Sequence, residues 1–226
     1  MIDELKLELY NYRQKCTQVD EKGDSSAMKS EYEVYKRIFD KYNGVIKTSE
    51  FKKEGYHHSI LKKLVDEGII VKIKRGYYEW QEEFISDATI ITRLYPEAVV
   101  YLNSALFIYG YIDRTPNEWH LAVNRGSARL KFDIDYPRVK TYYINKEYMS
   151  IGKMEYIYEE QRINIFDRDR TICDTIRYSN KMDKEIINQA IKNYLNDSKK
   201  NIGNLMTYAR KLRSESKVKT MIGVWL

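Results

Sequence analysis

Hydrophobic residues between positions 30 and 80 recur every three or four residues in three successive stretches, which predicts three helices. We expect Ser30 to cap the first helix, with Glu33 completing a capping box, and Thr48 to cap the short second one. A glycine follows each stretch at a point where it favours the end of a helix. The predicted helices are residues 30–42, 49–54 and 57–67, and the glycines are Gly44, Gly55 and Gly68.

The residues after the third helix predict a β-hairpin from Ile69 to Trp80. Its first half is a β-branched run, its turn is Arg75-Gly76, and its second half is aromatic. A helix, a short helix, a third helix and a hairpin, with a tight turn between the second and third helices, is the order of a winged helix-turn-helix. The sequence therefore predicts a winged helix-turn-helix DNA-binding domain at residues 28–82.

Residues 1–27 precede this domain and differ from it in pattern. Apolar residues at helical spacing predict one helix from residue 2 to residue 17. The residues from Thr17 to Ala27 are mostly polar, which is typical of a linker. We therefore expect an N-terminal helix and a linker here. The apolar face of the predicted helix is Leu5, Leu9, Tyr12 and Cys16.

Residues 83–226 combine strand-like runs with longer helical patterns near the C-terminus. Strands followed by helices indicate an α+β arrangement. The predicted fold class is therefore α+β, an N-terminal winged helix-turn-helix followed by a mixed α+β C-terminal domain ending in several helices. The predicted strands are residues 99–101, 119–123, 139–144, 154–158 and 162–166, and the predicted helices are residues 84–94, 103 or 104 to 109, 169–179, 183–196, 201–213 and 215–226.

The positive charge is concentrated in two segments. The net charge of +6 and the pI of about 9.0 permit nucleic-acid binding without requiring it. From Lys52 to Arg75 there are seven basic residues against three acidic ones, and from Lys199 to Lys219 seven against one. Because the first segment coincides with the predicted winged helix, it favours double-stranded DNA as a partner.

The composition indicates a cytoplasmic protein. Hydrophobic residues make up 43% and charged residues 32%, a mixture that folds around a core. No apolar run approaches the roughly 18 residues that cross a bilayer, and the first residues carry acids where a secretory signal is apolar. Two distant cysteines, Cys16 and Cys173, indicate ordinary thiols in a reducing compartment. We expect no membrane partner.

The third helix is expected to enter the major groove with its N-terminal half. Histidine and serine side chains there reach base edges, whereas lysines hold phosphates and release counterions. Basic residues of the hairpin would follow the backbone or enter the minor groove, and those of the second helix would touch a flanking phosphate. Winged helices also serve as protein-docking modules, and this alternative stays open. The candidate DNA-binding residues are Lys52, Lys53, His57, His58, Ser59, Lys62, Lys63, Lys72, Lys74 and Arg75.

A charged motif from Asp167 to Asp174 follows a predicted strand and opens a helix. We expect Asp169 to cap this helix and Arg170 to pair with Asp174 one turn later. The alternative is a metal-binding carboxylate pair, Asp167 and Asp169, in a nuclease that the winged helix directs to DNA. We favour the structural role, because a third metal ligand is not evident in the sequence.

Other catalytic patterns do not occur. The sequence contains no phosphate-binding loop, dinucleotide-binding glycine motif or nucleophile elbow. His120 lies in an apolar strand and Cys173 in an apolar helix, so both are expected to be structural. The adjacent His57 and His58 lack further ligands for a metal. We therefore expect a protein that is not an enzyme and that has no catalytic residue, no metal site and no cofactor.

Segments in both halves follow, in order, the pattern of one known family. Their combination resembles the AbiEi family, the antitoxins of bacterial abortive-infection (type IV) toxin–antitoxin systems. The resemblance covers about residues 30–220, and its segments in the second half are the more specific ones. The matching segments are Leu64-Val65-Asp66-Glu67-Gly68-Ile69-Ile70, Lys74-Arg75-Gly76-Tyr77-Tyr78, Asn103-Ser104-Ala105-Leu106, Trp119-His120-Leu121-Ala122-Val123, Ile165-Phe166-Asp167-Arg168-Asp169-Arg170-Thr171-Ile172-Cys173-Asp174 and Leu205-Met206-Thr207-Tyr208-Ala209.

The resemblance implies a transcriptional repressor that binds the promoter of its own operon through the winged helix. It also implies a C-terminal domain that counteracts a nucleotidyltransferase-type toxin in phage defence, with or without a stable complex. Inverted repeats at the promoter would indicate two protomers side by side on the DNA. The basic C-terminal segment would supply an antitoxin surface. The alternatives are a solvated helix face and an extension of the DNA-contacting surface. The candidate residues of this surface are Lys199, Lys200, Arg210, Lys211, Arg213 and Lys217.

Overall fold

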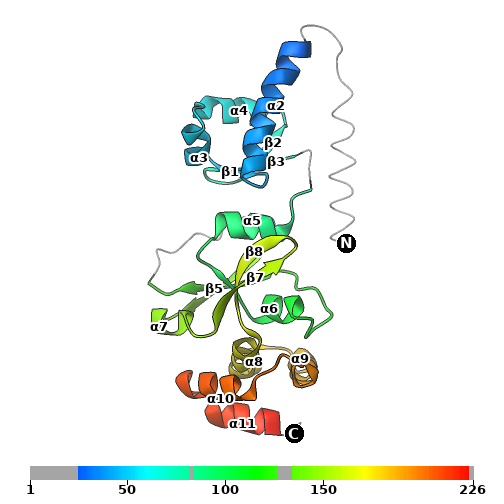
Figure 1. Cartoon of the computed structure of the whole chain (residues 1–226), viewed down its shortest axis with the longest axis vertical. Helices are drawn as coiled ribbons and strands as arrows, with labels where there is room; N and C mark the ends of the chain where they lie inside the picture. Colours follow the sequence, from blue (N-terminus) through cyan, green and yellow to red (C-terminus); the bar gives the residue numbers. More distant parts are fainter. Residues whose placement is uncertain (1–24, 82–83, 127–133, 224–226) are drawn as a thin grey trace. The chain divides into compact units, whose positions relative to one another are not determined.

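The computed structural model describes residues 25–81, 84–126 and 134–223 (Figure 1). The helix expected at residues 2–17 lies outside these ranges. The contacts form two compact units that meet in the sequence between Ile38 and Phe39. The boundary expected between residues 82 and 83 therefore stays a prediction, because the residues on both of its sides belong to the second unit.

Between Ser25 and Trp80 the structure has three helices and a small antiparallel sheet. The turn between α3 and α4 confirms the helix-turn-helix, and β2 and β3 form the expected hairpin. Unexpectedly, the short apolar segment at Val45 is a third strand, β1, which pairs with β3 and gives the order β1-β3-β2. The elements are α2 (Ser25–Lys41), β1 (Val45–Lys47), α3 (Thr48–Lys53), α4 (His58–Asp66), β2 (Ile70–Lys74) and β3 (Tyr77–Trp80).

Two of the expected helix starts are wrong. α2 begins at Ser25, so Ser30 lies inside the helix and does not cap it. Thr48 is the first residue of α3, and the capping residue is Lys47. The backbone N–H of Lys47 donates to the Glu50 carboxylate at 2.8 Å, which stabilises the first turn without a serine or threonine cap. The Thr48 backbone N–H instead donates to the carbonyl oxygen of Gly76 at 2.9 Å.

Aromatic side chains form the core beneath the helix-turn-helix. Phe39 lies 5.2 Å from the ring of Trp80 and 6.5 Å from the ring of Phe51, measured between ring centroids. Leu61 and Leu64, on one face of α4, are fully buried. Their burial leaves the opposite face of α4 to the solvent.

The C-terminal part is built on a five-stranded mixed sheet with the order β6-β5-β4-β8-β7. β5 pairs with β6 and β4 with β8 in parallel, while the other two pairs are antiparallel. The five strands of this sheet start and end within one residue of their predicted bounds, which confirms the expected α+β fold class. The strands are β4 (Val99–Val100), β5 (Trp119–Asn124), β6 (Val139–Ile144), β7 (Lys153–Tyr158) and β8 (Gln161–Phe166).

Helices pack on the sheet and on one another. α8 contacts α6, α9, α10 and α11, and Figure 1 shows α9, α10 and α11 gathered around it. Ser86, not a residue near Phe84, caps α5, because its hydroxyl accepts the backbone N–H of Thr89 at 3.2 Å. The helices are α5 (Asp87–Leu94), α6 (Leu102–Ile108), α7 (Lys146–Met149), α8 (Arg168–Arg177), α9 (Lys184–Asn196), α10 (Ile202–Lys211) and α11 (Glu215–Gly223).

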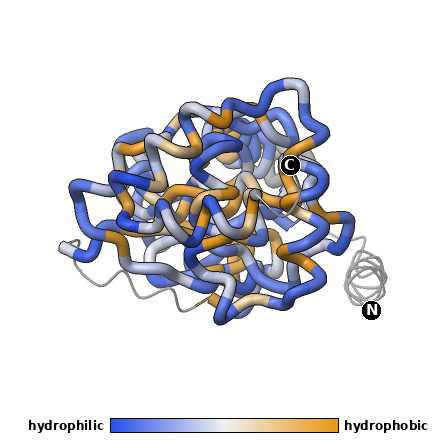
Figure 2. Tube along the Cα trace, turned by 90° about the horizontal axis from the view of Figure 1, so that it is seen from below, coloured by the Kyte–Doolittle hydropathy of each residue, from blue (hydrophilic) through white to orange (hydrophobic). Residues whose placement is uncertain are grey.

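Hydrophobic residues lie mainly inside this arrangement and hydrophilic residues mainly along its outer turns (Figure 2). Ile91 and Leu94 of α5 share a buried cluster with Leu121 and Ile165 of the sheet. A second buried cluster joins α6 to the C-terminal helices. Within the described ranges, no helix has both the length and the apolar character that a membrane crossing requires.

Candidate nucleic-acid interface

The exposed face of α4 carries polar residues of two chemical kinds. His58 and Ser59 lie in its first turn, and Lys62 and Lys63 lie one turn further on. All four side chains are exposed, because the buried face of the helix is Leu61 and Leu64. The structure thus brings together, on one accessible helix face, the hydrogen-bonding and cationic residues that the sequence assigned to base edges and phosphates.

His57 lies one residue before α4 and caps it. Its backbone is extended, with φ −77° and ψ 145°, and its Nδ1 accepts the backbone N–H of Ser59 at 3.3 Å. Its ring also lies against that of His58, with 4.2 Å between the centroids. The sequence identified His57 as a DNA-contacting residue but missed its capping role, because histidine is not among the residues that commonly cap helices.

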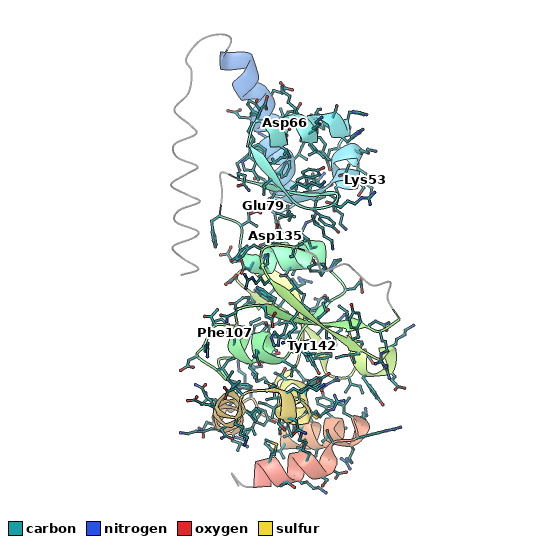
Figure 3. All side chains as sticks on the ribbon, turned by 180° about the vertical axis from the view of Figure 1, so that it is seen from behind. Lys53, Asp66, Glu79, Phe107, Asp135 and Tyr142 are labelled. Carbon is teal, nitrogen blue, oxygen red and sulfur yellow. The ribbon has the colours of Figure 1, made fainter. Side chains whose placement is uncertain are left out.

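α3 adds two further cations. Phe51 is its buried residue, whereas Lys52 and Lys53 are exposed. Figure 3 shows Lys53 at the outer edge of this part of the chain. The turn that follows α3 contains Gly55, whose φ of +93° is favourable only for glycine. This turn sets α3 against α4, so the two pairs of lysines belong to consecutive helices of the helix-turn-helix.

The hairpin turn carries Arg75, which is exposed, and Gly76, which has a φ of +78°. Lys72, on β2, is exposed as well. The carbonyl oxygen of Gly76 accepts the backbone N–H of Thr48, so the hairpin turn is tied to the first residue of α3. This hydrogen bond keeps the basic residues of the hairpin turn close to the start of α3.

Lys74 is placed differently from Lys72 and Arg75. A register shift between Lys72 and Lys74 interrupts the pairing of β2 with β3. The Lys74 side chain is half-buried, and its ammonium lies 4.6 Å from the centre of the Tyr95 ring, just after α5. A cation over an aromatic face is attracted to it, and this position differs from the expected one along a DNA backbone. The structure therefore does not group Lys74 with the exposed hairpin cations.

Arg93, on α5, contacts the helix-turn-helix and was missed by the sequence reasoning. Its Nε donates to the carbonyl oxygen of Val45 at 3.0 Å, and its Nη2 forms an ion pair of 2.5 Å with Glu50. Its guanidinium also lies 5.3 Å from the centre of the Tyr42 ring. No local pattern reveals these contacts, because the partners lie more than 40 residues away in the sequence.

The basic residues of the C-terminal segment do not all have the same surroundings. The Lys217 ammonium is half-buried and donates to the carbonyl oxygen of Arg177 at 3.3 Å, so its charge lies at the C-terminal end of α8. This contact gives Lys217 a structural role that the sequence did not predict. The exposed residues of the candidate antitoxin surface are Lys199, Lys200, Arg210, Lys211 and Arg213.

The helix cap expected at Asp169 is wrong, because Asp167 caps α8. One carboxylate oxygen of Asp167 accepts the backbone N–H of Arg170 at 2.7 Å, and the other accepts the Tyr208 hydroxyl at 2.7 Å. Burial raises the pKa of Asp167 above its usual value. Asp169 is itself buried and accepts the Tyr194 hydroxyl and the backbone N–H of Asn201, both at 2.8 Å.

The pairing of Arg170 with Asp174 is confirmed, at 2.7 Å. Arg177 donates to the other oxygen of the Asp174 carboxylate. Protein donors thus surround the carboxylates of this motif, and within the described residues no group of three or more His, Cys, Asp or Glu is arranged to hold a metal. The hydrogen bonds that Asp167 and Asp169 accept from protein donors are those of a structural role, and the nuclease alternative is not tested by them.

The two residues expected to be structural, His120 and Cys173, are buried. The Tyr142 hydroxyl lies 3.2 Å from Nδ1 of His120. Burial lowers the pKa of His120 to about 4. The nearby Glu118 carboxylate acts in the opposite direction and raises this pKa, but by less than burial lowers it. Burial also raises the pKa of the Cys173 thiol to about 11.

Residues 33–79, which contain all the candidate DNA-binding residues, match a family model described as "Transcriptional regulator, AbiEi antitoxin". The segment is thus similar to the AbiEi family, and residues 33–79 are called the AbiEi-type segment below. This match confirms the resemblance drawn from the first half of the sequence and supports a regulator of a toxin–antitoxin system. No curated protein among those compared matches the chain. Arg93 and the whole α+β part lie beyond the AbiEi-type segment, and for them the resemblance stays a prediction.

Proposed function

We propose that this chain is a transcriptional repressor that binds promoter DNA of its own operon. α4 lies in the major groove, with its N-terminal residues at base edges and Lys62 and Lys63 at phosphates. The β2–β3 hairpin acts as the wing and places Lys72 and Arg75 along the backbone. The observation that carries the proposal is the exposed polar face of α4 within the AbiEi-type segment.

The second half of the proposed function is that of an antitoxin. The C-terminal part counteracts a nucleotidyltransferase-type toxin of a type IV, phage-defence system, with or without a stable complex. The exposed cations of the C-terminal segment are the candidate surface for this role, and they lie outside the AbiEi-type segment. Two protomers bind side by side where the promoter carries inverted repeats.

The repressor half is tested by gel shift of the full chain on the DNA upstream of its own gene. At about 100 mM salt we expect a specific shift, which weakens as salt increases because counterions are released from the phosphates. Changing Lys62 and Lys63 to Glu should abolish the shift. The matched control is Lys192→Glu, which alters an exposed lysine of α9 and should leave the shift intact. A folded wild-type chain that gives no shift would refute the proposal.

The antitoxin half is tested by expression of the neighbouring gene with and without this chain. We expect the neighbour to stop growth when expressed alone and to be tolerated when the chain is present. Reversing the charge of Lys199 and Lys200 should weaken protection while the DNA shift is kept. If the neighbouring gene is harmless on its own, the antitoxin proposal is refuted and the repressor proposal stands by itself.

A further inference from the structure

We propose that Arg93 is a positioning residue for DNA binding, which holds α3 so that Lys52 and Lys53 meet the phosphates. The inference rests on the DNA-binding function proposed above. It assigns a part of that function to a residue outside the AbiEi-type segment, at the start of the α+β part.

Arg93 binds the helix-turn-helix through three groups at once. Its guanidinium donates to the carbonyl oxygen of Val45 and to the Glu50 carboxylate, and it covers the face of the Tyr42 ring. The side chains of Arg93 and Glu50 are 23% and 17% exposed, so water screens their ion pair less than it screens a surface pair. A planar guanidinium with several fixed donors sets the orientation of its partners, which a lysine ammonium does not.

Glu50 transmits this contact to α3. The carboxylate oxygen that binds Arg93 also accepts the backbone N–H of Lys47, the capping residue of the helix. α3 is six residues long, so its first turn, which contains Glu50, is directly followed by Lys52 and Lys53. A shift of this first turn therefore moves both lysines.

The other end of the contact lies among buried residues. Arg93 lies in α5, between residues that are buried in the cluster shared with the sheet. Val45, which accepts the Arg93 hydrogen bond, belongs to the same cluster. Through Arg93, α3 is therefore attached to the buried cluster that α5 shares with the sheet. α4 is instead capped by its own His57, and no described contact joins α4 to Arg93.

This difference between α3 and α4 gives a test that a general loss of stability would not mimic. Affinity for the promoter duplex is measured with the full chain, in the wild-type background and in Arg93→Met. In the wild type, changing Lys52 and Lys53 to Gln should weaken binding about tenfold, through lost phosphate contacts. In Arg93→Met the same pair of changes should weaken it less than about twofold, because those contacts are already lost.

The matched control pair is Lys62→Gln with Lys63→Gln on α4, which should weaken binding by the same factor in both backgrounds. In Arg93→Lys, changing Lys52 and Lys53 to Gln should weaken binding by less than half of the wild-type factor. Lysine keeps the positive charge but lacks the paired N–H donors of the guanidinium. If Arg93→Met does not fold, Glu50→Gln, which removes the same ion pair, takes its place with the same expectations.

The inference is overturned if the two substitutions in α3 weaken binding equally in both backgrounds. It is also overturned if the two substitutions in α4 lose their effect in Arg93→Met together with those in α3. Either result would leave the DNA-binding function in place. A wild-type chain that binds no DNA would overturn both, so the two failures are distinguishable.

Discussion

Arg170 and Asp174 form an ion pair of 2.7 Å in which neither side chain is exposed to solvent. The Arg170 guanidinium also donates to the carbonyl oxygens of Tyr148 and Ile151, so it links α8 to the segment that precedes β7. Both charges are enclosed by the protein, and Nε and Nη1 of Arg170 donate to protein oxygens, whereas its Nη2 has no hydrogen-bond partner among the described residues. Removing one partner of an enclosed pair leaves the other charge buried and uncompensated, which destabilises the fold.

Replacing Asp174 by Ala should therefore lower the free energy of unfolding by about 3–5 kcal/mol, because it leaves two arginines without their shared carboxylate. Urea unfolding followed by circular dichroism measures the change. Glu215→Ala is the matched control, since Glu215 pairs with Lys219 at the same helical spacing but near solvent. It should cost no more than about 0.5 kcal/mol. Equal effects of the two changes would contradict the buried role of Asp174.

Gly152 lies close to the same pair. A Cβ placed on it would come within 2.7 Å of the Arg170 Cβ and 3.0 Å of an Asp167 carboxylate oxygen. We expect Gly152→Ala to destabilise the protein by about 2–4 kcal/mol, from the positive φ together with the clash. Gly110→Ala, which also has a positive φ but open space around it, isolates the backbone contribution and should cost about 1 kcal/mol. Thermal unfolding that ranks the two variants equally would argue against the clash.

His120 predicts a pH dependence of stability. Its pKa is lowered to about 4 in the folded protein, mainly by burial, whereas the unfolded value is about 6.5. Between these values the unfolded chain binds the proton more readily. The free energy of unfolding therefore keeps its full value, as far as His120 is concerned, above about pH 6.5. As the pH falls toward 4, protonation of His120 in the unfolded chain lowers it by up to about 3 kcal/mol.

Urea midpoints measured at about pH 7 and about pH 4.5 test this, with His120→Gln as the variant that lacks the titration. The wild type should lose more stability on acidification than His120→Gln does. His58→Gln, an exposed histidine on α4, should behave like the wild type. Identical pH profiles for the wild type and His120→Gln would refute the prediction.

The cap formed by His57 predicts different effects for two substitutions at that position. Asparagine is a favourable capping residue and should preserve the stability of α4, whereas alanine removes the acceptor of the Ser59 N–H. We expect His57→Ala to lower the free energy of unfolding by about 1 kcal/mol relative to His57→Asn. Hydrogen exchange of the α4 amides would localise the change. If exchange in α4 is the same in His57→Ala as in the wild type, His57 does not cap the helix.

Much of the secondary structure was accessible from the sequence because hydrophobic spacing is a local property. The strands of the large sheet and the helix-turn-helix follow from it directly. Helix starts were less accessible: Ser86 replaces the expected start near Phe84, since a side-chain hydrogen bond decides where the first turn forms. The strand β1 was missed because its strand character depends on its pairing with β3, which lies much later in the sequence.

The candidate site was predictable only in its exposed residues. The lysines of α3 and α4 could be assigned from charge and spacing, since a helix has one buried face and one free face. The contacts of Lys74 with Tyr95 and of Arg93 with Glu50 join segments far apart in the sequence. A single sequence holds no record of such contacts, because they depend on how the sheet and the helix-turn-helix pack together.

The network around α8 also affects how genetic screens on this chain are to be interpreted. Tyr194 of α9, Tyr208 of α10 and Lys217 of α11 all bond to α8 or to its capping residue. A change in the acidic motif at the start of α8 would remove the bonds to α9 and α10 together, and proteolysis would then lower the cellular level of the protein. In a screen for the antitoxin activity proposed above, loss of activity through this motif would therefore reflect a lower protein level, and only substitutions that leave that level unchanged would identify a contact with the proposed toxin.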